Sequence, residues 1–94
     1  MPPVTRLADV CTGHGCFPSR ANCQASGDVF VNGRGAHRVG DAYPSHCCGP
    51  SCHAGNAASG SGSVFVNGRP LVRVGDAVSC GGSSATGSGD VFAN

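Results

Sequence analysis

Short apolar runs alternate with glycine-rich polar segments along the chain, and two of these runs end in the same way. Residues 28–32 read Asp-Val-Phe-Val-Asn and residues 63–67 read Ser-Val-Phe-Val-Asn, and a Gly follows each run. A run of β-branched and aromatic residues that ends in Asn-Gly is a strong signal for a β-hairpin. The pattern therefore predicts two hairpins, whose return strands fall at residues 36–39 and 71–74.

A second pattern, interleaved with the first, places an Arg three residues before an Asp. It occurs at residues 3–9, 35–41 and 70–76. A repeat that cannot bury its own apolar face must pack against its copies. Three copies in so short a chain favour a pseudo-threefold arrangement over an open solenoid. A third apolar run at residues 89–94 has no return strand after it, so we expect it to pair with the first segment and close a ring.

The repeated aromatic and charged residues are interpreted as structural. Phe30, Phe65 and Phe92 occupy equivalent positions of the three runs, and we expect them to form a small internal core, with an exposed apolar set as the alternative. An exposed ion pair contributes only about 0–1 kcal/mol to stability. Because the Arg and Asp recur at equivalent positions, we expect each pair to brace a loop rather than to be a solvated surface pair.

Composition limits the fold to one small domain, residues 1–94, with few helices. The chain has sixteen Gly but only four Phe, one Tyr and no Trp. Each Gly inside a helix costs about 1 kcal/mol relative to Ala. The expected fold is mostly β, with short strands and hairpins. Chains of this size often need a metal or disulfides for stability, and seven Cys and four His offer the groups for either.

Charge and hydropathy exclude several classes of function. The formal net charge is +1 and there is no basic stripe, so binding of nucleic acid through its phosphates is not expected. The chain contains no apolar run of membrane-spanning length and no signal-peptide core at its N-terminus. We therefore expect synthesis in a cytoplasm, or earlier removal of a targeting segment, and export by another route.

Potential metal ligands follow each Arg/Asp unit. His14 and His46 each lie five residues after the Asp of their unit, and Cys80 lies four residues after the Asp of its own. His53 follows His46 by seven residues and can supply a fourth ligand. Zinc takes four nitrogen or sulfur ligands in a tetrahedron, and a closed structural site contributes directly to folding. The spacing predicts one structural zinc bound by His14, His46, His53 and Cys80.

Several alternatives remain open at this point. A rival zinc site would use Cys47, Cys48 or Cys52, or Cys11 together with Cys16. His37 lies on a return strand at a position without ligand equivalents, and we expect it to be solvated. If Cys80 binds metal, the other six cysteines either form three disulfides or stay reduced, and the sequence does not choose among the pairings. These six are Cys11, Cys16, Cys23, Cys47, Cys48 and Cys52.

The residues do not indicate an enzyme. A hydrolytic zinc keeps one open coordination position beside a general base, and this chain contains no Glu. No nucleophile stands with a base and an orienting group in a recognisable pattern. A thiol enzyme based on Cys47 and Cys48 would need a thiol of lowered pKa and is the weaker hypothesis. The alternative to a metal-pinned structural protein is a disulfide-framed extracellular binding module without metal.

These motifs together resemble the PAAR-repeat family. Residues 70–76, Pro-Leu-Val-Arg-Val-Gly-Asp, are the closest copy of the unit for which that family is named. Residues 35–41 and 3–9 are looser copies, and Ala8 replaces the usual Gly in the latter. The strand and Asn-Gly units also match the family pattern. A single motif is weak, but three in register with the ligand loops cover essentially the whole chain.

The resemblance implies a small pseudo-threefold cone of short strands, built from three PAAR-like repeats and pinned by one zinc near its apex. By motif position the ligands would again be His14, His46, His53 and Cys80. The broad base of such proteins sits on a trimeric β-helical spike, and the apex pierces a membrane. The resemblance does not distinguish a type VI secretion system from a contractile phage tail.

Partners and location follow from the same resemblance. The expected partners are the spike protein, a target membrane touched transiently and, in some family members, effector cargo. We expect residues 1–94 to be a bare tip without a toxin or adaptor extension. It would reside in the cytoplasm of the producing cell before assembly. It would then occupy the tip of the injection machine or virion tail and be delivered into the target cell envelope.

Overall fold

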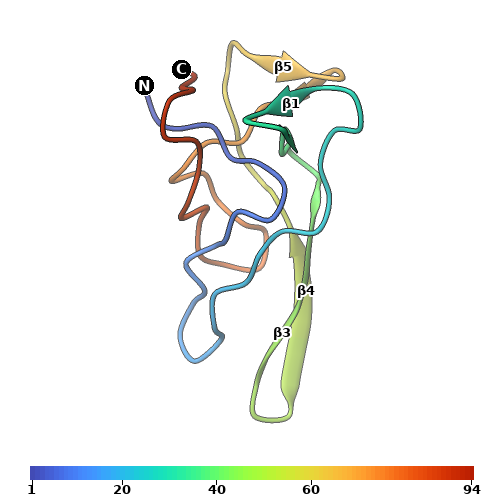
Figure 1. Cartoon of the computed structure of the whole chain (residues 1–94). Helices are drawn as coiled ribbons and strands as arrows, with labels where there is room; N and C mark the ends of the chain where they lie inside the picture. The colour runs from blue at the N-terminus through green and yellow to red at the C-terminus, as the bar shows by residue number, and fades with distance from the viewer.

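The protein folds into three antiparallel hairpins joined by long irregular segments (Figure 1). The computed structural model describes residues 1–94. Its hairpins pair β1 (Phe30–Val31) with β2 (Arg34–Gly35), β3 (Ala42–Cys48) with β4 (Ser51–Asn56), and β5 (Phe65–Val66) with β6 (Arg69–Pro70). There is no helix, so the mostly β prediction is confirmed. No helix that could cross a membrane is therefore present.

The two Asn-Gly turns form where the sequence predicts them. Asn32 and Asn67 have φ angles of 54° and 55°, and the glycine after each also has a positive φ. Two consecutive positive φ angles define the tight hairpin turn that Asn-Gly favours. The return strands begin directly after these two-residue turns, at Arg34 and Arg69, earlier than the sequence-based boundaries.

The longest hairpin covers residues 42–56, where the sequence pattern predicts no strand. Strands β3 and β4 pair antiparallel with a bulge between Tyr43 and His46, and the β3–β4 turn projects beyond the rest of the chain at one end of the molecule (Figure 1). The segment lacks the apolar alternation of an ordinary strand. Cysteine pairs and the single buried Tyr43 stabilise it instead, and for that reason hydrophobic patterning missed it.

Three equivalent segments meet in a closed cycle of backbone hydrogen bonds. The amide of Thr5 donates to Val72 O at 2.9 Å, Val72 N donates to His37 O at 3.0 Å, and His37 N donates to Thr5 O at 3.1 Å. Each residue directly precedes the Arg of its repeat, and all three are buried. The repeats are thus joined cyclically. Pseudo-threefold symmetry of the molecule as a whole stays a prediction.

The position of His37 in this cycle corrects the sequence-based expectation. His37 is fully buried rather than solvated, and its Nδ1 lies 2.8 Å from Gln24 O. Burial lowers the pKa of His37 below its ordinary value, so the ring is neutral at pH 7. A neutral imidazole can fill a core position that a charged one could not.

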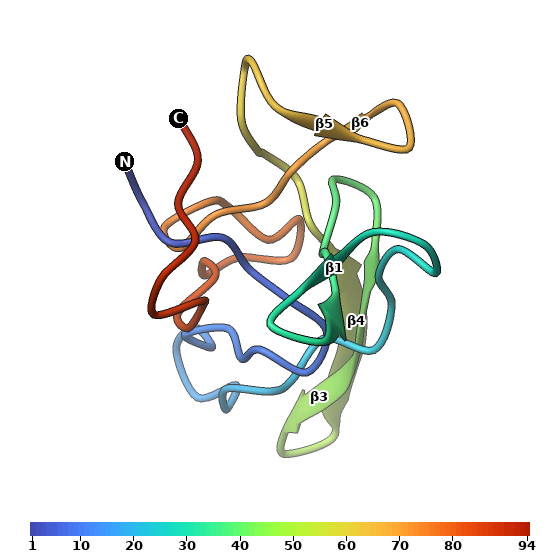
Figure 2. The ribbon, with the colours of Figure 1, turned by 45° about the horizontal axis from the view of Figure 1, so that its top comes forward.

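The ring closes between the two ends of the chain, as predicted. Val4 N donates to Val91 O at 3.0 Å and Ala93 N donates to Pro2 O at 3.1 Å. The two termini lie side by side in both ribbon views (Figure 2). The last run therefore pairs with the first segment, through an isolated antiparallel bridge between Pro3 and Phe92.

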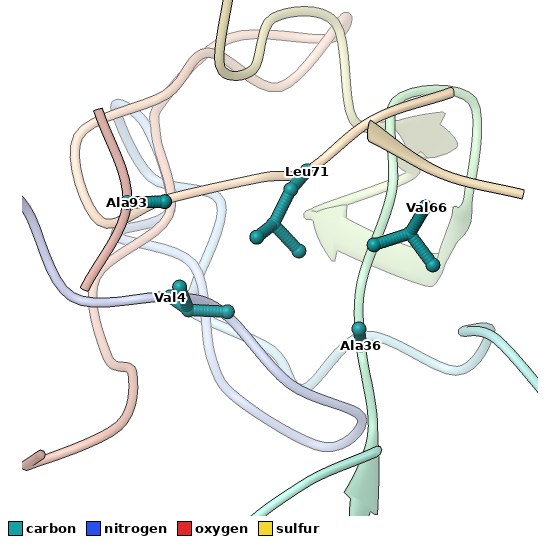
Figure 3. Packing of buried hydrophobic residues seen from close by; sticks show 5 residues of the cluster. All are labelled: Val4, Ala36, Val66, Leu71 and Ala93. Carbon is teal, nitrogen blue, oxygen red and sulfur yellow. The ribbon is translucent and has the colours of Figure 1, made fainter. Parts of the chain in front are cut away.

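One of two apolar clusters, each of five buried residues, lies between the hairpins and the terminal segments (Figure 3). It contains Val4, Ala36, Val66, Leu71 and Ala93, with Val31 packed against it. These residues come from two sets of equivalent positions. Val4, Ala36 and Leu71 each precede a residue of the hydrogen-bonded cycle, and Val31, Val66 and Ala93 each follow a Phe. The three repeats therefore contribute to one core in the same way.

The phenylalanines themselves are exposed, which contradicts the prediction that they form the core. Phe30, Phe65 and Phe92 are 60%, 56% and 46% exposed. Successive side chains of an extended segment point to opposite faces. Since Val66 and Ala93 face inward, the Phe before each one faces outward.

Each Arg/Asp unit has the predicted bracing role. Arg38 donates from its backbone N and its Nε to Asp41 Oδ2, at 2.9 and 2.8 Å, and from Nη2 to Asp41 Oδ1 at 3.0 Å. The other two units repeat these three bonds. Burial alone would raise the pKa of Asp41, but the bonds from Arg38 outweigh it and hold that pKa below its ordinary value.

Candidate metal centre

The β3–β4 hairpin places two of the predicted ligands directly opposite each other. His46 on β3 pairs in register with His53 on β4, and their ring centroids are 4.7 Å apart. The loop after Asp9 brings in His14, and the loop after Asp76 brings in Cys80. Their ligand atoms and those of the two hairpin histidines all lie within 4.8 Å of one another. The spacing argument thus selected four side chains that the fold brings together.

The donor atoms converge through the same nitrogen of each ring. His53 Nε2 lies 3.1 Å from His14 Nε2 and 2.8 Å from His46 Nε2, and Cys80 Sγ lies 3.9 Å from His46 Nε2. Tetrahedral zinc with ordinary bond lengths would separate two nitrogens by about 3.3 Å and a nitrogen from a sulfur by about 3.6 Å. The four groups could therefore hold a metal ion of this kind after their ligand atoms shift by up to about an ångström.

Hydrogen bonding fixes the metal-binding form of His46. Its Nδ1 lies 2.8 Å from Pro18 O, a carbonyl that can only accept, so the proton is on Nδ1. In a neutral ring with this tautomer, Nε2 carries the lone pair, and it lies 2.8 Å from His53 Nε2. A ligand imidazole commonly donates its second N–H to a carbonyl or carboxylate in this way.

The surroundings of His53 favour its neutral form. Desolvation and then the neighbouring His46 and His14 lower the pKa of His53 below its ordinary value. Only neutral imidazole binds a metal ion. The clustering that disfavours a charged ring therefore favours the metal-binding state.

A tight turn places His14 and presses Phe17 against the cluster. The amides of His14 and Phe17 donate to each other's carbonyls at 3.1 and 2.9 Å, and Gly15 between them has a positive φ of 55°. The Phe17 ring centroid lies 4.3–4.9 Å from those of all three imidazoles. Phe17 was not singled out in the sequence because no repeat contains an equivalent residue.

Two disulfides brace the same region. Cys47–Cys52 joins β3 to β4 next to the His46/His53 pair, and Cys16–Cys48 joins the His14 turn to the end of β3. Cys11, Cys23 and Cys80 remain as thiols. The rival zinc sites are therefore wrong, because Cys16, Cys47, Cys48 and Cys52 are engaged in disulfides. The three bridges expected for a metal-free, disulfide-framed module do not form either.

Sequence analysis did not identify Arg20, a buried charged residue beside the cluster. Arg20 is 9% exposed, and its guanidinium contacts Cys80 Sγ, Cys11 Sγ and His46 Nδ1. It belongs to none of the repeats. The sequence indicated such a residue only indirectly. The chain has six Arg but only three Asp in the repeated units, so an Arg without a carboxylate of its own was to be expected.

Comparison with known proteins identifies the family. The chain matches the PAAR motif over residues 10–86, which is most of its length. It belongs to the PAAR-motif family. No curated protein matches the chain. The matched range begins after the first Arg/Asp unit but includes all four converging side chains, so the PAAR motif and the geometric cluster coincide. PAAR-motif proteins are structural proteins of spike tips, a role with which both the small fold and the His/Cys cluster are consistent.

Proposed function

We propose that this PAAR-motif protein is the structural, non-enzymatic tip of a contractile injection machine, either a type VI secretion system or a phage tail. It caps a trimeric β-helical spike and is pinned by one zinc bound to His14, His46, His53 and Cys80. One observation supports this proposal most directly: an exposed apolar set and a metal-competent cluster lie on different parts of the molecule.

The apolar set lies at the end of the molecule opposite the β3–β4 turn, which we term the base. It consists of Phe30 on β1, Phe65 on β5 and Phe92 near the C-terminus, and the segments that carry them gather at this end (Figure 1). The adjacent Val29, Val64 and Val91 are also exposed. Exposed apolar patches on small proteins mark interaction sites. Three equivalent Val-Phe pairs suit a partner with threefold symmetry.

The other end is built for rigidity. Metal coordination would cross-link β3, β4 and the loops that carry His14 and Cys80, and two disulfides add to this in the same region. Structural zinc sites contribute folding free energy directly. A cross-linked end resists deformation when it is driven into a target membrane.

The tip would be made and assembled in the cytoplasm of the producing cell and carried into the target envelope, with effector cargo as a further passenger.

Spike docking is tested at the base. Phe30→Asp, Phe65→Asp and Phe92→Asp, combined in one protein, are expected to abolish binding to the trimeric spike protein from the same source. The melting temperature should change little, because all three side chains are exposed. Ser45→Asp, at an exposed position on β3, is the matched control and should bind normally. Unchanged binding by the triple variant would overturn the docking proposal.

The metal is tested separately by native mass spectrometry. One zinc per chain, released on acidification, is expected for the wild type and absent from His46→Ala and Cys80→Ser. A wild-type protein purified with zinc available that carries no metal would refute the zinc assignment.

A further inference from the structure

Arg20 is the one cationic side chain without a carboxylate partner. All six cationic side chains of the protein are arginines, and five of them pair with Asp9, Asp41 or Asp76. The two remaining carboxylates, Asp28 and Asp90, bond Ser and Asn side chains. Burial of a charged group is costly unless charged or hydrogen-bonding partners compensate for it. The partners of the Arg20 guanidinium are therefore informative.

Each nitrogen of that guanidinium has a defined neighbour. Nε donates to Pro44 O, Nη1 donates to Cys11 Sγ at 3.2 Å, and Nη2 donates to Cys80 Sγ at 3.3 Å. The group also lies over the ring of Tyr43, with Cζ 5.1 Å from the ring centroid. Arg20 thus connects the second apolar cluster, which contains Cys11, Tyr43, Ala57, Val72 and Val78, with the metal-competent cluster.

The backbone leaves room for the contact between Arg20 and Cys80. A Cβ atom at Gly55 would lie 2.8 Å from Cys80 Sγ and 3.1 Å from Arg20 Nη2. Any side chain there would displace one of the two groups. Gly55 on β4 therefore keeps open the space in which the N–H···S bond forms.

Of the groups that Arg20 contacts, Cys80 is the one that metal binding makes anionic, because a metal-bound thiol is deprotonated. Resting on the metal centre proposed above, we propose that Arg20 is a positioning residue for it. Its Nη2–H bond to the Cys80 thiolate holds the sulfur at the point where the three imidazole Nε2 atoms converge. The Nε–H bond to Pro44 O anchors the guanidinium to β3, the strand that carries His46.

This role predicts the sign of a measurable change. Loss of a hydrogen bond to a metal ligand typically weakens metal affinity about 10- to 100-fold. Charge repulsion between a guanidinium and a metal dication acts in the opposite direction, so an arginine that merely sat nearby would weaken binding, and its removal would tighten it. The direction in which metal affinity changes when Arg20 is removed therefore distinguishes a positioning arginine from one that merely lies nearby.

The experiment uses the full chain with Co²⁺ and Zn²⁺ as probes. The wild type should bind one Co²⁺ with a sulfur-to-cobalt charge-transfer band that Cys80→Ser lacks. Failure of this step would refute the metal centre itself. Given that band, Arg20→Met is expected to shift it and to weaken zinc binding, measured against a competing chelator, by about 10- to 100-fold. Arg20→Met with the wild-type band and wild-type or tighter affinity would overturn the positioning role alone.

Arg38→Met is the matched control for a structural arginine. It removes a guanidinium that braces Asp41 and touches none of the four converging side chains, so it should lower stability without moving the cobalt band. If Arg20→Met does not fold, Arg20→Lys decides the question, because lysine keeps the charge but offers a differently placed donor. A shifted band with weaker binding then supports the proposal, and an unchanged band with unchanged affinity overturns it.

Discussion

The hydroxyl of Ser88 donates a hydrogen bond to Asn32 Oδ1 at 2.6 Å, across 56 positions of sequence. The same oxygen of Ser88 accepts the amides of Asp90 and Val91 at 3.2 and 2.9 Å. Ser88 thus uses the Asn of another repeat's hairpin turn to complete a local turn of its own. This relationship explains why the Asn in Asn-Gly matters beyond its tolerance of positive φ.

Ser26 repeats this arrangement with Asn67, whereas Ser61 bonds only its two local amides. Loss of a buried hydrogen-bond partner costs about 1–3 kcal/mol. We expect Ser26→Ala and Ser88→Ala to lower the free energy of unfolding by about 2 kcal/mol and Ser61→Ala to lower it less. Urea unfolding of the three variants measures the difference. Equal losses would show that the contacts with Asn do not contribute.

Asp41 should be less tolerant of substitution than Asp76. Asp41 is fully buried and receives both Arg38 and Arg69, whereas Asp76 receives Arg73 and a long contact from Ser59. Breaking a buried pair by removing one partner costs about 3–5 kcal/mol. Asp41→Asn is expected to lower the free energy of unfolding by about this amount, and Asp76→Asn is expected to lower it by less. Chemical unfolding measures both losses. A larger loss for Asp76→Asn would contradict this ranking.

Acid should destabilise the protein through the same carboxylates. Burial alone would raise the pKa of Asp9, Asp41 and Asp76, but their arginines hold all three below the ordinary value. Their stabilising effect is therefore fully present above the unfolded-state pKa of about 3.9 and is lost as pH falls through the lower folded-state values.

The free energy of unfolding, measured from pH 5 down to pH 2, should decrease most steeply below about pH 4. Asp41→Asn should show a shallower decrease, because it lacks one of the groups that titrate. A parallel decrease in both proteins would rule out Asp41 as a contributor.

The two disulfides should differ in their contribution to stability. Cys16–Cys48 spans 32 residues of sequence and Cys47–Cys52 spans 5. The chain-entropy relation gives about 4 kcal/mol for the longer loop and about 2 kcal/mol for the shorter one. We expect Cys16→Ser/Cys48→Ser to lower the thermal midpoint more than Cys47→Ser/Cys52→Ser. The reverse order would mean that the hairpin depends on its cross-strand bridge more than on the tether to the His14 turn.

Gly55→Ala should impair metal binding more than folding. The added Cβ meets a sulfur and the end of a long side chain rather than backbone, so the fold can adjust while Cys80 and Arg20 move apart. Zinc affinity is expected to fall at least several-fold, with little change in the stability of the metal-free protein. Gly49→Ala at the β3–β4 turn is not a suitable control, because Gly49 has a positive φ. Gly27→Ala, with open space around its Cβ, serves instead.

The sequence predicted those features that repeat. The Asn-Gly turns, the ring closure and the convergence of His14, His46 and Cys80 all follow from positions that recur relative to an Arg/Asp unit. Residues without a counterpart in the other repeats were missed. Arg20 and Phe17 lie in the loop after the first unit, and the loops after the other two units contain no equivalent residue. Their roles depend on contacts with β3 and β4.

The error over the phenylalanines has a specific physical cause. Large aromatic side chains usually mark a core, but here each Phe sits beside a smaller residue that faces inward, as Phe65 does beside Val66. The alternation of an extended segment fixes only that the two neighbours differ in orientation. Which of the two faces inward is decided by the space between the repeats, and that space accommodates Val or Ala.

The cyclic joining of the repeats also bears on how the protein is made. Thr5 N donates to Val72 O and Pro2 O accepts from Ala93 N, so the hydrogen bonding of the first segment is incomplete until the last segment has been made. An emerging chain on a ribosome can form its Asn-Gly turns early, but its core stays open until residues 91–93 have left the exit tunnel. Folding of the domain can therefore be completed only after nearly all of residues 1–94 have been synthesised.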